Sequence, residues 1–192
     1  MLTVVSPEKI YLSAGTVLRS PATWQEYQAL CEQRGDGSIP RIKYRSGEVL
    51  LMSPLPKHGK EAHLIAAIIT TSLDYQNQEY DAFTPVTMQL PEESGIEPDY
   101  CFYIDNWEAV SGKERIDWRN DPPPDLLLEI DVANCSDVRN YLLYRVPEVW
   151  LSTSERYVLS TVQFKNAPLA TPAQHIVMLF WGEDKARRLF AT

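Results

Sequence analysis

Residues 122–131 of the chain read PPPDLLLEID, a stretch in which acidic residues directly follow a run of apolar ones. The three prolines end any preceding regular structure, and the residues from Leu126 to Ile130 predict a buried β-strand. Glu129 and Asp131 are two residues apart, so their side chains project from the same face of such a strand. Because burying an ionised carboxylate without a partner is costly, these two acids need a physical explanation.

A second acidic stretch, EPDYCFYI at residues 97–104, predicts another strand with Asp99 near its start. If the two strands are neighbours, Asp99 approaches Glu129 and Asp131. Three carboxylates at one sheet edge repel one another unless a cation lies between them, and Mg²⁺ (or Mn²⁺) suits such oxygen ligands. An ion held there can activate water and stabilise charge on a phosphodiester. Carboxylates at strand ends are common, so the spacing by itself favours solvated acids that pair with surface Lys and Arg side chains.

Other patterns predict helices and strands around these two stretches. Thr23 is a predicted N-cap with Glu26 at the capping-box position, so a short helix is expected to end near Gly35. Residues 41–54 predict a β-hairpin that turns at Ser46–Gly47. Further helices are expected at 57–77 and 137–145, further strands at 82–90, 148–154, 156–164 and 175–181, and a loop at 91–95.

The order of these elements predicts a mixed α/β fold, a central sheet flanked by helices, in a single domain over residues 1–192. We expect an N-terminal helix and hairpin at 20–54, a core at 57–165, and a C-terminal strand and tail at 172–192. The helix at 57–77 is expected to face the sheet with an apolar stripe made of Leu64, Ile65, Ile68, Ile69 and Leu73.

Composition excludes several classes of protein. The cysteines, Cys31, Cys101 and Cys135, lie far apart without a CxxC pair, which argues against a zinc or disulfide framework and favours a reduced, cytoplasmic compartment. No apolar run approaches the ~20 residues that span a membrane. The glycines form no phosphate-binding loop, which argues against the common nucleotide-dependent enzymes. A net charge of −8 weakens a proposal of strong nonspecific nucleic-acid binding but leaves room for a local basic patch.

Several blocks of the sequence resemble, in order and wording, the Uma-type proteins that are abundant in cyanobacteria. The blocks are LLMSPLPKHGKEAHLI, EPDYCFYIDN, VSGKERIDWRNDPPPDLLLEIDV and VPEVWL, within residues 20–155. This resemblance implies a restriction-endonuclease-like fold of the PD-(D/E)xK superfamily. The family pattern then places the first metal-ligand acid on Asp99, after Pro98, and the second on Glu129.

The same resemblance implies roles for residues outside these strands, and it also has departures. The superfamily lysine would stand at position 131, where this chain has Asp131. The resemblance instead points to Arg139, on the following helix, as the basic residue, and to Glu61, on the helix before Asp99, as an outer acid. Arginine keeps its charge and cannot act as a base, but it can contact a phosphate. Gly59 stands where relatives often carry an acid.

These observations lead to a functional expectation and two alternatives. We expect a Mg²⁺- or Mn²⁺-dependent endonuclease acting on nucleic acid, with DNA as substrate, in which Asp99, Glu129 and Asp131 bind the metal. Arg139 would contact a phosphate and Glu61 would assist the water or the metal. We also expect a cytoplasmic homodimer without a membrane segment. The alternatives are a nuclease-fold protein that has lost cleavage and acts as a binding or assembly module, and a hydrolase of small phosphoesters.

Overall fold

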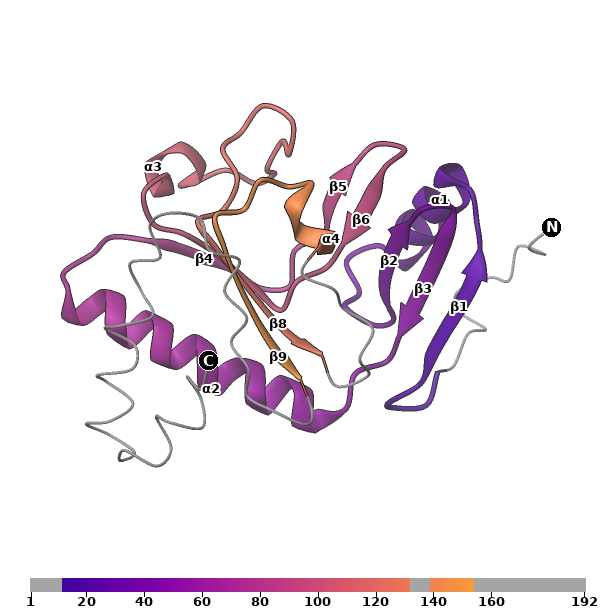
Figure 1. Ribbon diagram of the computed structural model, residues 1–192, viewed down its shortest axis with the longest axis horizontal. Helices are drawn as coiled ribbons and strands as arrows, with labels where there is room; N and C mark the ends of the chain where they lie inside the picture. The colour runs from indigo at the N-terminus through magenta and orange to yellow at the C-terminus, as the bar shows by residue number, and fades with distance from the viewer. Residues whose placement is uncertain (1–11, 132–138, 154–192) are drawn as a thin grey trace. The chain divides into compact units, whose positions relative to one another are not determined.

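The computed structural model describes residues 12–131 and 139–153, so the strands expected at 156–164 and 175–181 lie outside the described residues. The chain forms two compact units (Figure 1). One, called here the N-terminal unit, comprises Met1–Gly59 and Thr87–Glu97, and the other, the core unit, comprises Lys60–Val86 and Pro98–Thr192. The expectation of a single domain stays a prediction.

A five-stranded antiparallel sheet forms the centre of the N-terminal unit, in the order β1–β3–β2–β6–β5. The strands are β1 (Val17–Pro21), β2 (Arg41–Arg45), β3 (Glu48–Met52), β5 (Met88–Leu90) and β6 (Ser94–Ile96). The predicted hairpin is confirmed as β2 and β3, and both residues of its turn have positive φ, 51° at Ser46 and 79° at Gly47. The strand β1 was not expected from the sequence.

The expectation of one strand at 82–90 followed by a loop at 91–95 is wrong. The segment contains two strands of different sheets, β4 (Asp81–Phe83) and β5, and the expected loop contains the start of β6. Pro85 lies between β4 and β5 and has no N–H to donate, which explains why a single ladder does not continue through it.

Helix α1 (Trp24–Arg34) begins with the predicted capping box, which is confirmed. The N–H of Thr23 donates to Oε2 of Glu26 (2.7 Å), and the N–H of Glu26 donates to Oγ1 of Thr23 (3.2 Å). These hydrogen bonds satisfy two amides at the helix start. The bonds that the Glu26 carboxylate accepts from the N–H and the hydroxyl of Thr23 lower the pKa of this carboxyl. The helix ends at Gly35, as expected.

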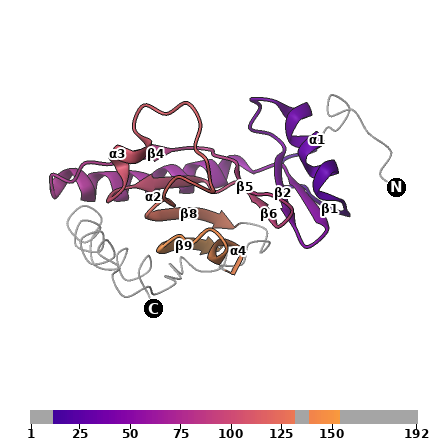
Figure 2. The ribbon, with the colours of Figure 1, turned by 90° about the horizontal axis from the view of Figure 1, so that it is seen from above.

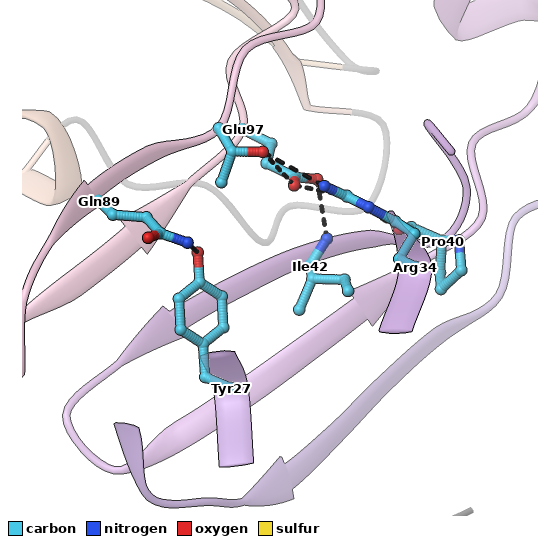
Figure 3. Close-up of polar contacts among 7 residues, drawn as sticks. Tyr27, Arg34, Pro40, Ile42, Gln89 and Glu97 are labelled. Carbon is cyan, nitrogen blue, oxygen red and sulfur yellow. Dashed lines mark hydrogen bonds and ion pairs between the residues drawn. The ribbon is translucent and has the colours of Figure 1, made fainter. Parts of the chain in front are cut away.

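A buried ion pair links the end of α1 to the sheet (Figure 3). The guanidinium of Arg34 contacts the carboxylate of Glu97, and it also donates to Oγ1 of Thr87 (3.2 Å). The same carboxylate accepts hydrogen bonds from Oγ1 of Thr87 (2.9 Å) and from the N–H of Ile42 on β2 (2.9 Å). Glu97 therefore ties α1, β2 and the segment after β6 together within this unit.

Gly95 on β6 is packed so closely against α1 that a side chain there is expected to destabilise the N-terminal unit. A Cβ atom at this position would lie 2.1 Å from the hydroxyl oxygen of Tyr27, which is fully buried. We expect Gly95→Ala to lower the free energy of unfolding by about 1–3 kcal/mol or more through overpacking. Gly59→Ala is the control, since a Cβ there meets no atom within 4 Å and its helical position favours alanine. Denaturant unfolding measures the free energy of unfolding of both variants. Equal stability of the two would contradict the expectation.

The core unit contains a four-stranded sheet in the order β4–β7–β8–β9. Its remaining strands are β7 (Tyr100–Tyr103), β8 (Leu126–Asp131) and β9 (Glu148–Thr153), and only the β8–β9 pair is parallel. Helix α2 (Pro56–Tyr75) runs along one face of this sheet, and α4 (Arg139–Leu142), in the connection from β8 to β9, lies on the other side (Figures 1 and 2). A short helix, α3 (Trp107–Val110), follows β7.

The hydrophobic core of this unit lies between α2 and the sheet. Its buried residues are Ala62, Ile65, Ala66, Ile68, Ile69, Leu73, Phe102, Leu126, Leu128, Ile130 and Trp150. The predicted stripe on α2 is therefore confirmed except at Leu64, whose side chain is 43% exposed. The predicted mixed α/β fold is confirmed as well. Across the described part of the chain, no helix is both long and apolar enough to cross a membrane.

Candidate active site

The two faces of β8 have different surroundings, and this separates its acids from the hydrophobic core. Leu126, Leu128 and Ile130 belong to the core that packs against α2. Because side chains alternate along a strand, Glu129 and Asp131 project from the opposite face, as predicted. All six residues of the strand are buried. The sequence pattern of four apolar residues and two acids thus divides one strand into a packing face and a face on which Leu127 precedes the two acids.

Asp99 lies against β8, just before the neighbouring strand begins. Its backbone N–H donates to the carbonyl oxygen of Leu128 (3.0 Å), and its Oδ2 atom accepts a hydrogen bond from the N–H of Ile130 (2.7 Å). The carboxylate of Asp99 is thus held at the peptide bond that joins Glu129 to Ile130. The two acidic strands are neighbours, with Tyr100 opposite Leu128, so the condition for bringing Asp99 to Glu129 is met.

The three carboxylates are buried, which contradicts the interpretation of these residues as solvated strand-end acids. The exposed fraction is 1% for Asp99, 1% for Glu129 and 4% for Asp131. Each of the three has at least one further interaction within the protein. A carboxylate stays ionised in a protein interior only where hydrogen bonds, opposite charges or a metal ion compensate for its lost hydration. The bond from the Ile130 amide supplies part of this compensation for Asp99.

The chemistry of these side chains fits a hard divalent cation, because carboxylate oxygens are the preferred ligands of Mg²⁺ and Mn²⁺. Among the described residues, no group of three or more His, Cys, Asp or Glu side chains is arranged to hold a metal ion. The described residues therefore do not support a site with three carboxylate ligands. They leave a smaller set of two candidate ligands, Asp99 and Glu129. Mg²⁺ is often bound by one or two carboxylates, with water and substrate phosphate completing its shell.

The other two predicted site residues come from different elements. Glu61 is half-buried on α2, one residue before Ala62, which packs into the core on the face of the sheet opposite to Glu129. Arg139 is the first residue of α4, and its side chain lies outside the described part of the structure. The roles of both residues stay predictions.

Asp125, the residue before β8, is a structural acid whose role the sequence did not predict. Its Oδ2 atom accepts hydrogen bonds from the N–H groups of Ile104 (2.7 Å) and Asp105 (3.0 Å). It thereby holds the turn that follows β7. Asp125 directly precedes β8, so a structural carboxylate stands before the strand and the candidate site lies at its end.

Glu148 is a second buried acid without a counterpart in the sequence analysis. It is the first residue of β9 and accepts a hydrogen bond from the indole Nε1 of Trp150 (2.6 Å). Burial raises the pKa of its carboxyl, and the indole hydrogen bond lowers the pKa in part. Trp150 belongs to the core on the α2 side of the sheet, and residues two apart on β9 share a face, so Glu148 lies away from Glu129.

The raised pKa of Glu148 makes a pH-dependent contribution to stability. A carboxyl with a higher pKa in the folded state stabilises the fold below the unfolded-state pKa, and this contribution is lost as pH rises through the folded-state pKa. We expect Glu148→Gln, which keeps an acceptor for Trp150, to gain stability over the wild type as pH rises from mildly acidic to neutral. Denaturant unfolding of both proteins across this range measures the difference, and a difference independent of pH would contradict the expectation.

Comparison with known proteins places the chain in a family. Residues 24–166, more than half of the chain, match the Uma2 family, which is described as "Putative restriction endonuclease". The chain belongs to the Uma2 family. The predicted resemblance to Uma-type proteins is confirmed. No protein in the curated collection of sequences matches the chain.

A solved structure supports the fold of this Uma2 protein. The crystal structure of a protein from Anabaena variabilis, described as a putative nuclease belonging to DUF820, matches with a TM-score of 0.55. The two sequences are 18% identical, and the match covers 89% of this chain and 98% of that chain. At this identity the likeness shows the fold, so the predicted restriction-endonuclease-like fold is confirmed.

Proposed function

We propose that this Uma2 protein is a metal-dependent endonuclease that hydrolyses phosphodiester bonds in nucleic acid, with DNA as its substrate. The observation that carries the proposal is the position of Asp99, whose buried carboxylate is hydrogen-bonded to the amide directly after Glu129. The description of the family, "Putative restriction endonuclease", supports the same reaction.

Each residue of the proposed site has a distinct task. Asp99 and Glu129 would hold Mg²⁺ or Mn²⁺, which when bound supplies charge stabilisation and a more acidic water. Asp131, on the same face of β8 as Glu129, would orient a water or a ligand of the ion. Arg139 would contact the phosphate of the substrate with its permanent charge, and Glu61 would assist as an outer acid.

A second function has a specific observation in its favour. Asp131 stands where the superfamily pattern has lysine, and Gly59 stands where relatives often carry an acid. Both departures favour a nuclease-fold protein that has lost cleavage and acts as a binding or assembly module. The homodimer and the cytoplasmic location stay predictions under either function.

Two measurements on the purified chain separate these functions. Calorimetric titration with Mn²⁺ is expected to show binding that Asp99→Ala abolishes, and supercoiled plasmid DNA is expected to be nicked when Mg²⁺ or Mn²⁺ is present. Absence of binding heat would support the module without cleavage. A folded, Mn²⁺-binding protein that cleaves neither DNA nor RNA would contradict the endonuclease proposal.

A further inference from the structure

Asp99, the proposed metal ligand, is held by hydrogen bonds from two different segments of the core unit. Its N–H donates to the carbonyl oxygen of Leu128 on β8 (3.0 Å), and its Oδ2 atom accepts a hydrogen bond from the N–H of Ile130 on the same strand (2.7 Å). Its backbone carbonyl oxygen accepts a hydrogen bond from Oγ1 of Thr84 (2.6 Å), which directly follows β4. Thr84 therefore contacts the residue whose carboxylate lies against β8.

The sequence around this hydrogen bond restricts both of its partners. Pro85 follows Thr84 and limits the backbone conformations of the residue before it, and the branched threonine side chain is restricted at χ1. Pro98 precedes Asp99 and has a fixed φ angle. A donor and an acceptor that are already restricted lose little conformational entropy when they pair. The hydrogen bond therefore holds the carbonyl of Asp99 in one orientation.

The hydroxyl of Thr84 extends the contact between β4 and β7 beyond their backbone ladder. The ladder ends at the pair of Phe83 and Cys101, and Pro85 has no N–H to donate. The side chain of Thr84 supplies a donor at this end of the sheet instead. Thr84 is exposed, so water can replace its hydroxyl and the bond contributes little to stability. A water molecule does not fix the direction of the Asp99 carbonyl, however, because it is not tied to the chain.

We propose that Thr84 is a positioning residue for the metal site and orients the carboxylate of Asp99 through the backbone. Its hydrogen bond fixes the peptide plane that follows Asp99, while the bonds to Leu128 and Ile130 fix the preceding plane and one carboxylate oxygen. Mg²⁺ demands near-ideal octahedral geometry, so a ligand that is free to rotate binds it less well. The inference rests on the proposed function, because it needs the ion that Asp99 and Glu129 would hold.

Calorimetric titration of the full chain with Mn²⁺ compares three variants with the wild type. Thr84→Val keeps the shape of the side chain and removes the donor, so it should weaken Mn²⁺ binding about tenfold, the lower end of what partners of metal ligands contribute. Thr84→Ser keeps a hydroxyl and should bind Mn²⁺ within a few-fold of the wild type. Thr71→Val is the matched control, because the exposed Thr71 on α2 also donates to a backbone carbonyl oxygen, that of Ala67 (2.7 Å). It should leave Mn²⁺ binding unchanged.

Hydrogen exchange followed by NMR in the absence of metal tests the same link without the ion. The amide of Ile130 donates to Oδ2 of Asp99, so it should exchange faster in Thr84→Val than in Thr71→Val. We expect a difference of roughly two- to tenfold, the range that corresponds to one hydrogen bond. If Thr84 contributed to stability alone, exchange of all core amides would rise alike and Mn²⁺ binding would not change. Thermal melting verifies that each variant is folded.

The outcomes distinguish this inference from the proposed function. Equal Mn²⁺ affinities of folded Thr84→Val and the wild type would overturn the positioning role while leaving the endonuclease intact. Equally weak binding by Thr84→Ser and Thr84→Val would also overturn it, because the hydroxyl would then not be the cause. Absence of Mn²⁺ binding by the wild type would remove the proposed metal site and this inference with it. Mn²⁺ binding that depends on the hydroxyl of Thr84, in a protein that never cleaves, would support the inference and remove the endonuclease.

Discussion

Asp99→Asn and Glu129→Gln are each expected to lower the rate of DNA cleavage by about a thousandfold or more. Each substitution removes a negative charge from the proposed ligand pair and keeps the shape of the side chain. A loss of about 4 kcal/mol of charge stabilisation in the transition state corresponds to about a thousandfold in rate. Asparagine at position 99 still offers an oxygen to the N–H of Ile130, so the strand pairing is expected to survive. Plasmid nicking rates with Mg²⁺ or Mn²⁺ measure the loss.

Asp125→Asn is the matched control for these two variants. Asp125 is also a carboxylate on the same stretch of sequence, and it also accepts hydrogen bonds from backbone amides. Its substitution changes the net charge by the same amount, at the other end of β8. We expect cleavage to remain within a few-fold of the wild type. If Asp99→Asn and Asp125→Asn reduce cleavage equally while both proteins remain folded, the site does not consist of Asp99 and Glu129.

The acidic strands could be predicted from the sequence because two independent signals agree there. Proline residues and an apolar run define the limits of β8, and the two-residue spacing of its acids determines that they share a face. The capping box of α1 and the Ser46–Gly47 turn were equally predictable, because both depend on residues close together in the chain.

Features that depend on contacts between distant segments could not be predicted from the sequence. The separation of β4 from β5 depends on which strand each one pairs with, and local propensity does not specify this. The burial of Asp99 depends on an amide 31 positions away, at Ile130. The same limit applies to Leu64, whose helical spacing places it at the margin of the stripe and whose exposure depends on how α2 lies on the sheet.

Glu97 illustrates how an acid close in the chain to the candidate site residues can have a separate structural task. It precedes Pro98 and Asp99 in the chain, so the sequence alone places it with the acidic residues. In the N-terminal unit its carboxylate contacts Arg34 and accepts hydrogen bonds from Thr87 and the N–H of Ile42. The side chains are 3% exposed for Glu97 and 11% for Arg34, so both charges are largely removed from water.

We expect Glu97→Ala to lower the free energy of unfolding by about 3–5 kcal/mol, because it leaves the charge of Arg34 buried without a countercharge. The double variant Arg34→Met with Glu97→Gln removes both charges and keeps an acceptor for the N–H of Ile42. It is therefore expected to be more stable than Glu97→Ala. Lys113→Ala is the control for an exposed ion pair, since Lys113 and Asp121 are 2.6 Å apart with the lysine side chain 41% exposed.

Removing that exposed pair is expected to change the free energy of unfolding by less than about 1 kcal/mol, because water screens the charges. Denaturant unfolding followed by circular dichroism compares the three variants under one condition. Since the two ion pairs have nearly the same length, a difference between Glu97→Ala and Lys113→Ala measures what burial adds. Equal losses in the two variants would contradict the expectation that burial makes Arg34 depend on the countercharge of Glu97.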